Sequence, residues 1–409
     1  MADKTILVVG TYDTKSPELA YMAERIRALG GGVLTMDMSV LGDPASPVDY
    51  PKHDVARAGG GSIREALDAG HENAAMQIMA RGAASLAAGL HGQGKVHGVV
   101  MLGGTMGTDA ALDICRALPL GVPKYVVSTI SFSPLIPPGR LSPDVQMILW
   151  AGGLYGLNSV CKATLSQAAG AVLGAARAAE APAGDRPVVG MTSLGSASMK
   201  YMTTLKPALE ERGYEVAIFH ATGMGGMAFE SIAARGGFCC VMDFALVELG
   251  NLMMGSVVKA GEDRLLGAGR AGTPQIVAPG YLNLVHIPTW QDPPPRFADR
   301  PFHTHNRLVK SGLLDRAERR DIAREVGRRL GESTGRTHFI LPNKGIVQWD
   351  RPGYEAHDPD GMAAFADELR KSVAAPVRMT ELDCHINDPE FAAAALEIFD
   401  RWVDDGTVG

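Results

Sequence analysis

The turn from Gly10 to Lys15 is the densest cluster of chemically useful side chains near the start of the chain. It contains Thr11, Asp13, Thr14 and Lys15 within five positions. Hydroxyls and backbone N–H groups can hold phosphate oxygens, a lysine can neutralise them, and an aspartate can hold a ribose hydroxyl or Mg²⁺. The turn is therefore predicted to bind a nucleotide-type cofactor. Ordinary turn chemistry and helix capping are the alternative interpretation.

A second stretch, residues 98–108, has the form of a strand, a glycine loop and a helix. An apolar run leads to Gly103, Gly104 and Gly107, and Thr108 is predicted to cap the helix that follows. This arrangement aims backbone N–H groups and a helix N-terminus at one point, which suits a phosphate. It is not a Walker loop, because the pattern GxxxxGK[ST] does not occur. Tight geometry between a strand and a helix is the alternative.

Three further polar residues are predicted at the same sheet edge. Asp37 ends the second expected strand, where nucleotide-binding folds often place an acidic ribose ligand. Ser128 and Thr129 end the strand expected from Lys124. Because right-handed crossovers bring parallel strand ends to one edge, all three are predicted to join the cofactor site.

In the second half of the chain, the run from His220 to Gly226 reads His-Ala-Thr-Gly-Met-Gly-Gly. A histidine at a strand's carboxyl end can act as an acid or base, so His220 is the predicted catalytic residue, assisted by Glu230 and Asp243. The predicted substrate contacts are Thr222, Gly223, Gly225, Gly226 and His305. A capping network around a structural histidine explains the same residues equally well.

No metal site of the protein's own is predicted. A strand would place His303 and His305 on one face, but no third ligand has diagnostic spacing. The five cysteines contain no CxxC pair and are expected to be free thiols.

The elements expected around these residues alternate between strand and helix, which indicates parallel sheets. Residues 44–58 are expected to be irregular, residues 62–90 helical, and residues 227–235 a helix after the histidine turn. The segment 180–187 has the composition of a linker. The predicted fold is α/β, with two doubly wound Rossmann-like domains, residues 1–180 and 187–409, and a cleft between them.

Composition and charge indicate which classes of partner the protein can have. The chain has 409 residues and a net charge of -6, which gives no support for nucleic acid as a partner. No segment approaches the length of a membrane span, and the first apolar run is too short for a signal peptide. A cytoplasmic protein that acts on small molecules is expected.

Several of these motifs resemble the Tm-1-like (UPF0261) family. The likeness is carried in the first domain by residues 10–19, 117–124 and 128–129, and in the second by residues 219–226, 277–280, 305–306 and 385–388. The resemblance implies two Rossmann-like domains, a homodimer, and ATP binding in the first domain. The sequence departs from the family pattern at Met106, Phe132 and Asn283, which favours a divergent member.

The predicted function is binding of ATP or a related nucleotide, with Mg²⁺, in the first domain. A small anionic metabolite is expected in the second domain or the cleft, with the reaction undefined. One alternative is a lyase or hydrolase that acts on a small carboxylate without nucleotide, as the changes at Met106, Phe132 and Asn283 suggest. The other is a non-catalytic binding or inhibitory module, suggested by a plant member of the family that inhibits viral RNA replication.

Overall fold

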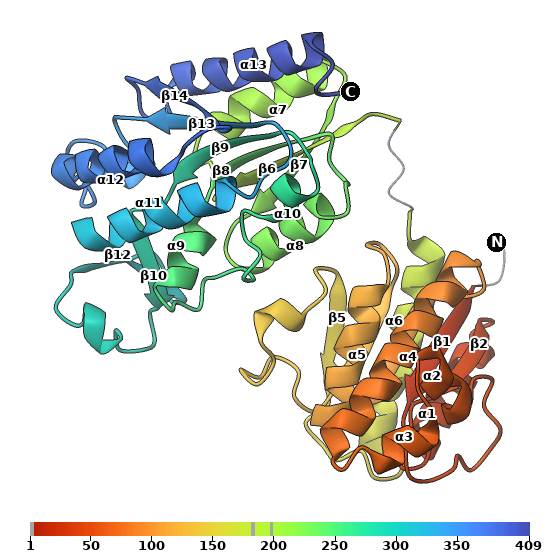
Figure 1. The fold of residues 1–409 in the computed structure, drawn as a ribbon. Helices are drawn as coiled ribbons and strands as arrows, with labels where there is room; N and C mark the ends of the chain where they lie inside the picture. Colours follow the sequence, from red (N-terminus) through yellow and green to blue (C-terminus); the bar gives the residue numbers. More distant parts are fainter. Residues whose placement is uncertain (1–3, 181–184, 197–198) are drawn as a thin grey trace. The chain divides into compact units, whose positions relative to one another are not determined.

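The computed structural model describes residues 4–180, 185–196 and 199–409. The chain divides into two compact units, residues 1–183 and 184–409 (Figure 1). Residues 181–184 of the expected linker lie outside the described residues.

The first unit is built around a five-stranded parallel sheet in the order β2-β1-β3-β4-β5. Its strands are β1 (Thr5–Gly10), β2 (Gly32–Asp37), β3 (Gly98–Gly103), β4 (Lys124–Ser128) and β5 (Val145–Leu149). Its helices are α1 (Ser16–Ala28), α2 (Lys52–Ala58), α3 (Ile63–Asp68), α4 (Glu72–Gly92), α5 (Thr105–Ala117) and α6 (Ser159–Ala178), with a short 3-10 turn η1 (Pro138–Arg140).

Helices cover both faces of this sheet. In β1, Leu7 and Val9 belong to the core shared with α2, α4 and α5, whereas Ile6 and Val8 belong to the core shared with α1 and α6. This alternation follows from the period of two in a strand, and a strand buried on both faces must be apolar throughout. The first unit is therefore a doubly wound α/β fold, as predicted.

The second unit repeats the design with a six-stranded parallel sheet in the order β14-β13-β9-β8-β6-β7. These strands are β6 (Val188–Ser193), β7 (Glu215–His220), β8 (Cys240–Ala245), β9 (Gln275–Gly280), β13 (Thr337–Pro342) and β14 (Arg378–Leu382). The helices are α7 (Tyr201–Glu211), α8 (Met224–Ala233), α9 (Val247–Met253), α10 (Gly267–Arg270), α11 (Arg316–Leu330), α12 (Pro359–Ser372) and α13 (Pro389–Asp404).

A small antiparallel sheet was not predicted. It has the order β10-β12-β11, with β10 (Leu284–Pro288), β11 (Phe302–Thr304) and β12 (Val309–Leu313), and the 3-10 turns η2 (Pro295–Phe297) and η3 (Gln348–Asp350) lie in nearby loops. Parallel sheets thus form both cores, as expected, while this third sheet is an insertion between β9 and α11.

Three local expectations were wrong. Helix α2 occupies part of the stretch 44–58 that was expected to be irregular. Helix α5 begins at Thr105, four residues earlier than predicted, and α8 begins at Met224, three residues earlier than predicted. Three of the glycines that suggested longer loops, Gly107, Gly225 and Gly226, lie inside the first turns of these helices. No helix in the described part of the chain is long and apolar enough to cross a membrane.

Candidate functional site

A cavity of about 580 Å³ lies in the first unit where the loops after β1 and β3 meet. These strands are neighbours in the sheet, but their crossovers run in opposite directions, β1 to β2 on one side and β3 to β4 on the other. Ligands of open α/β sheets bind at such a switch point, outside the carboxyl ends of the strands. Seven of the predicted cofactor residues line this cavity: Thr11, Asp13, Thr14, Lys15, Gly103, Gly104 and Gly107.

The loop after β1 forms one wall of the cavity. Its backbone is closed by hydrogen bonds from the N–H groups of Thr14 and Lys15 to the carbonyl of Thr11, and the hydroxyls of Thr11 and Thr14 lie 3.2 Å apart. The ammonium group of Lys15 makes no hydrogen bond or ion pair with the residues that the structure describes. The wall therefore offers two hydroxyls and an uncompensated positive charge.

The glycine loop after β3 forms the opposite wall. Helix α5 has Gly104 as its N-cap and no capping side chain. The first intrahelical bond runs from Thr108 N to Gly104 O at 2.9 Å, so the N–H groups of Thr105, Met106 and Gly107 precede the first intrahelical donor. An uncapped helix N-terminus at a cavity is suited to an anion.

Two glycines of this loop are needed for different reasons. A Cβ on Gly103 would lie 2.7 Å from the Cα of Gly107, so packing alone requires glycine there. A Cβ on Gly104 would meet nothing closer than Thr129 Oγ1 at 3.8 Å. Internal packing thus leaves room for a side chain at Gly104, and a ligand that approaches the backbone would account for its absence.

Four predicted cofactor residues do not line the cavity. Asp37 is fully buried, and its Oδ1 accepts hydrogen bonds from Tyr12 N at 3.1 Å and from the N–H and hydroxyl of Ser39. It ties the loops after β1 and β2 together and does not line the cavity. The hydroxyls of Thr108 and Ser128 are buried and lie 2.6 Å apart, which joins α5 to β4. Thr108 is therefore inside the helix and does not cap it.

Thr129 is the fourth predicted cofactor residue outside the cavity. Its N–H donates to the carbonyl of Gly103 at 3.3 Å, and its hydroxyl faces the open side of Gly104. Thr129 thus contacts the glycine loop but does not line the cavity.

The apolar side of the cavity was missed by sequence reasoning. It is formed by Val40, Leu41, Ala66, Leu67, Ala75 and Met76, together with the exposed Met106. Most of these residues belong to α3 and α4, which were expected to be one helix. The helical stretch is interrupted at Gly70, which has a left-handed φ of +81°, and His71 caps α4 by accepting a hydrogen bond from Ala74 N at Nδ1. The sequence Ala69-Gly70-His71 could have indicated this break, because a glycine in the left-handed conformation commonly ends a helix.

In the second unit, the predicted substrate turn surrounds a carboxylate of the protein itself. Oε1 of Glu248, a buried residue of α9, accepts hydrogen bonds from the N–H groups of Gly223 and Gly226 at the start of α8. A Cβ on Gly226 would lie 1.7 Å from Glu248 Oε2, and one on Gly225 would lie 1.8 Å from the carbonyl oxygen of His220. The N–H groups of this turn, which were predicted to contact an anionic substrate, are therefore already bound by the carboxylate of Glu248.

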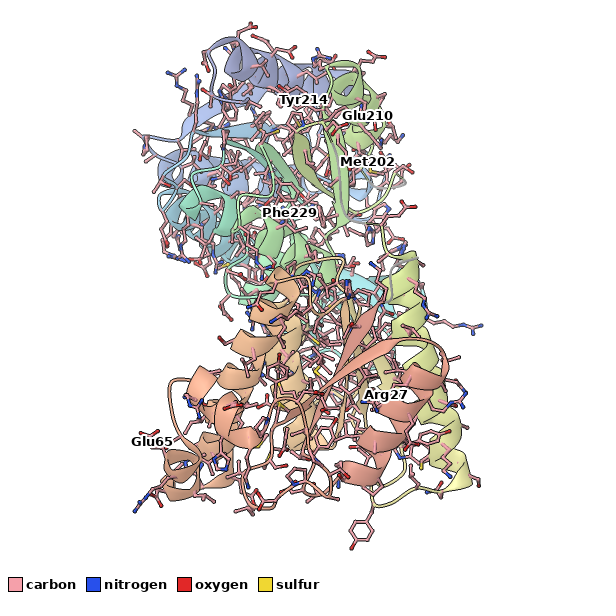
Figure 2. The ribbon with its side chains drawn as sticks, turned by 90° about the vertical axis from the view of Figure 1, so that its right-hand side faces the viewer. Arg27, Glu65, Met202, Glu210, Tyr214 and Phe229 are labelled. Atoms are coloured by element: carbon pink, nitrogen blue, oxygen red, sulfur yellow. The ribbon has the colours of Figure 1, made fainter. Side chains whose placement is uncertain are left out.

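The expected catalytic carboxylates belong to the same buried cluster. Arg264 is fully buried and contacts Glu230 at 3.0 Å, Glu248 at 3.0 Å and both oxygens of Asp243. Its guanidinium carbon lies 5.8 Å from the ring centre of Phe229 on α8, which Figure 2 labels. Burial raises the pKa of Glu230 to about 7 and raises the pKa of Glu248 as well.

This arrangement corrects the expected catalytic group. Both oxygens of Glu230 are engaged, since Leu265 N and Gly267 N donate to them in addition to Arg264. Glu230 therefore does not reach back to His220, which is exposed at the end of β7. Asp243 lies inside β8 and is 2% exposed, so it is not at a rim. Thr222 is exposed in the turn beside His220.

His305 lies beside Trp349 of the 3-10 turn η3. The rings of His303 and His305 lie 5.7 and 5.6 Å from that of Trp349, and His303 Nδ1 contacts Glu355 at 2.7 Å. In the described part of the chain, no group of three or more His, Cys, Asp or Glu side chains could hold a metal ion.

A second cavity, of about 650 Å³, lies in the second unit. It is formed by the loops after β9, β13 and β14 and by helix α12. Its floor holds His385 and Asp350, whose Nε2 and Oδ1 atoms lie 2.9 Å apart. None of its lining residues belongs to the His220 turn.

Both units thus belong to the doubly wound α/β class, with cavities at the carboxyl ends of parallel strands. Residues 4–181 match the N-terminal domain, and residues 186–403 the C-terminal domain, of the uncharacterised protein family UPF0261. The chain belongs to this family.

Relatives extend over nearly the full length of the chain. A UPF0261 protein of Brucella melitensis is 52% identical over 403 residues, which cover 98% of this chain and 96% of the relative. A UPF0261 protein of Clostridium tetani is 32% identical and covers 96% and 97% of the two chains. The ToMV susceptible protein tm-1(GCR26) of Solanum lycopersicum is 28% identical over 96% of this chain and 55% of its own length.

Proposed function

We propose that the first unit binds ATP or a related nucleotide in the cavity at the ends of β1 and β3. The observation that carries this proposal is the pairing of two features on opposite walls. Lys15 has no ionic partner among the described residues, and the uncapped N-terminus of α5 lines the same cavity. A phosphate chain between them would be neutralised by the ammonium group and would accept hydrogen bonds from the first N–H groups of the helix.

The apolar side of the cavity supports a ligand with a flat, partly apolar part. Ala66, Leu67 and Met76 lie on α3 and α4, across from the polar loops. The volume of about 580 Å³ is within the range of small-molecule sites, and one polar end with one apolar end matches the two ends of a nucleotide. Met106 is exposed and lines the same cavity, so its thioether can contact the base or ribose of a bound nucleotide.

The side chains present also fit a magnesium ion that accompanies the phosphates. Asp13 lines the cavity and its Oδ1 has no hydrogen-bond partner in the described structure, while the hydroxyls of Thr11 and Thr14 lie beside it in the loop. Mg²⁺ takes oxygen ligands and usually binds through one or two carboxylates plus phosphate oxygens. When bound, such an ion would neutralise the phosphate charge.

For the second unit we propose binding of a small anionic metabolite. Four cationic side chains, Arg319, Lys344, Arg351 and Arg370, line its cavity against three acidic ones, Asp350, Asp358 and Asp388. Lys344 and Arg370 are paired with Asp383 and Glu381 beside the cavity, so it is the unused guanidinium N–H groups of Arg319 and Arg351 that favour an anion.

Isothermal titration of the wild-type protein with ATP in the presence and absence of Mg²⁺ tests the nucleotide proposal. We expect saturable binding that Mg²⁺ strengthens, and weaker binding of AMP, which lacks the phosphates that Lys15 would contact. Absence of heat with ATP, ADP and GTP alike would overturn it.

A further inference from the structure

The cavity of the second unit lies at the carboxyl ends of three adjacent strands. Asn283 follows β9, Lys344 follows β13 and His385 follows β14, and these strands are neighbours in the order β14-β13-β9. Side chains separated by about a hundred residues are thereby brought to one edge of the sheet. Ligands of open parallel sheets bind outside this edge, whereas the opposite edge mainly serves stability.

The floor of this cavity is held rigidly. Asp350 Oδ2 accepts hydrogen bonds from Ile346 N at 2.7 Å and Asn283 Nδ2 at 3.3 Å, while Oδ1 pairs with His385 Nε2. The Nδ1 of His385 accepts a hydrogen bond from Asn387 N at 3.0 Å, so the ring proton lies on Nε2. With both ring nitrogens engaged, His385 positions Asp350 and has no free nitrogen for acid or base chemistry.

The backbone at Gly345 packs closely against the side chains of Asp350 and His385. Its φ is +134°, and a Cβ at this position would lie 2.2 Å from Asp350 Oδ1 and 2.5 Å from His385 Cδ2. Only glycine lets the backbone pass the two side chains at this distance. The floor is therefore preorganised.

Four polar atoms around the cavity have no hydrogen-bond partner in the described structure: Asn283 Oδ1, Arg319 Nη1, and Nε and Nη1 of Arg351. Asn283 is 3% exposed, and its Oδ1 is buried and unpaired. Arg319, also buried, uses Nε for Leu314 O and Nη2 for Asp358, which leaves Nη1 unused. Arg351 uses only Nη2, for Asp388 at 2.6 Å. Asn283 Oδ1 is buried, so its lack of a partner calls for an explanation, and a bound polar ligand supplies one. The side chain of Arg351 is 32% exposed, so its spare N–H groups are accessible to such a ligand.

The remaining wall is apolar. Met362, Ala363 and Ala366 line the cavity from α12, on the side of the helix that faces the strand ends. A ligand that used both walls would combine an anionic group, for the spare guanidinium donors, with a short carbon skeleton, for α12. Inorganic phosphate or sulfate would leave this apolar wall uncovered.

We propose that this cavity, and not the His220 turn, is the metabolite site of the second unit, and that it takes a small organic carboxylate. The inference rests on the proposed anionic metabolite for this unit and is independent of nucleotide binding in the first. Arg351 and Arg319 would hold the carboxylate, and Asn283 would orient the ligand through its amide. The His220 turn is unsuited to an external anion because Glu248 already occupies the N–H groups of Gly223 and Gly226.

The test uses thermal shift followed by calorimetry on the full chain, with malonate, succinate, glutarate, adipate, malate and citrate as probes and inorganic phosphate for comparison. We expect at least one carboxylate to stabilise the wild type more than phosphate does. Arg351→Gln removes the donor, and Ala363→Phe fills the mouth from an exposed position on α12. Each is expected to weaken binding at least tenfold, which corresponds to about 1.4 kcal/mol.

Two controls separate the location of the site from the existence of binding. Ala393→Phe makes the same substitution at an exposed position of α13 away from the cavity, and His220→Ala alters the other candidate. Both should bind as the wild type does. Unchanged binding in Arg351→Gln and Ala363→Phe, or loss in His220→Ala, would overturn the location while leaving metabolite binding intact. Failure of every carboxylate to bind the wild type, or equal stabilisation by phosphate, would overturn the ligand class.

Discussion

The carboxylate of Glu248 and the backbone of Gly226 are in direct contact: Glu248 Oε1 accepts the Gly226 N–H at 3.0 Å. The helix N-terminus that a free anion would occupy is satisfied by a residue 22 positions further along the chain. This contact explains the glycine-rich sequence of the turn without a ligand. It also makes the turn a stability element whose substitution should affect folding first.

Gly226→Ala is expected to destabilise the second unit by several kcal/mol, since its Cβ would lie 1.7 Å from Glu248 Oε2 in a buried site. The measurement is chemical denaturation followed by circular dichroism. Gly174→Ala provides the control, because Gly174 lies exposed in α6 with no atom within 4 Å of an added Cβ. That variant should gain up to about 1 kcal/mol from helix propensity. Equal stability of the two variants would contradict the assignment.

Arg264→Met is expected to cost about 3–5 kcal/mol or to prevent folding, because it leaves Glu230, Asp243 and Glu248 buried without their cation. Arg324→Met on α11 is the matched control. Arg324 is 55% exposed and pairs with Asp321 and Glu368 at the surface, so its loss should cost less than about 1 kcal/mol. Thermal unfolding of both variants at the same pH makes the comparison.

Glu230 is expected to make stability depend on pH. Its pKa rises from 4.5 to about 7 on folding, so the folded state holds this proton more tightly. The contribution is complete below about pH 4.5 and is lost as the pH rises through 7, with a maximum of roughly 3 kcal/mol.

Free energies of unfolding measured between pH 5 and pH 8 check this prediction. Glu230→Gln should show a smaller decrease than the wild type, and a lower stability throughout because all three partners of Glu230 are donors. The exposed Glu211→Gln should keep the wild-type slope. An unchanged slope in Glu230→Gln would show that other groups cause the dependence.

Gly103 and Gly104 should differ when each is replaced by alanine. Gly103→Ala is expected to lower the melting temperature, because of its 2.7 Å approach to Gly107, whether or not a nucleotide is present. Gly104→Ala is expected to keep the melting temperature, because its Cβ would meet no atom closer than Thr129 Oγ1 at 3.8 Å, and to weaken ATP binding, because it adds bulk to the loop that is proposed to hold the phosphates. A stable Gly104→Ala variant with wild-type affinity would place the phosphates elsewhere.

The fold could be predicted from local patterns because its main strands are apolar throughout and are separated by capped helices. Ser62, for example, begins the stretch predicted to be helical, and as the N-cap of α3 it accepts a hydrogen bond from Glu65 N. The grouping of Thr11–Lys15 with Gly103–Gly107 also followed from the sequence, since parallel topology brings both loops to one edge.

Other features could not be predicted from local sequence patterns, because they depend on tertiary packing. The partner of the His220 turn is Glu248, and that of Glu230 and Asp243 is Arg264; these pairings depend on how α8, α9 and the loop before α10 pack. The second cavity likewise gathers Asn283, Asp350 and His385 from three loops with no shared motif. A buried carboxylate and a ligand-binding carboxylate look the same in a sequence, because only burial distinguishes them.

The most direct test of the nucleotide proposal is calorimetric titration of Mg²⁺–ATP into three proteins: the wild type, Lys15→Ala, and Lys95→Ala, which removes an exposed lysine of the same unit outside the cavity. We predict that Lys15→Ala weakens binding at least tenfold, about 1.4 kcal/mol, and that Lys95→Ala binds as the wild type does. Equal affinity in all three proteins would contradict a phosphate site between Lys15 and helix α5.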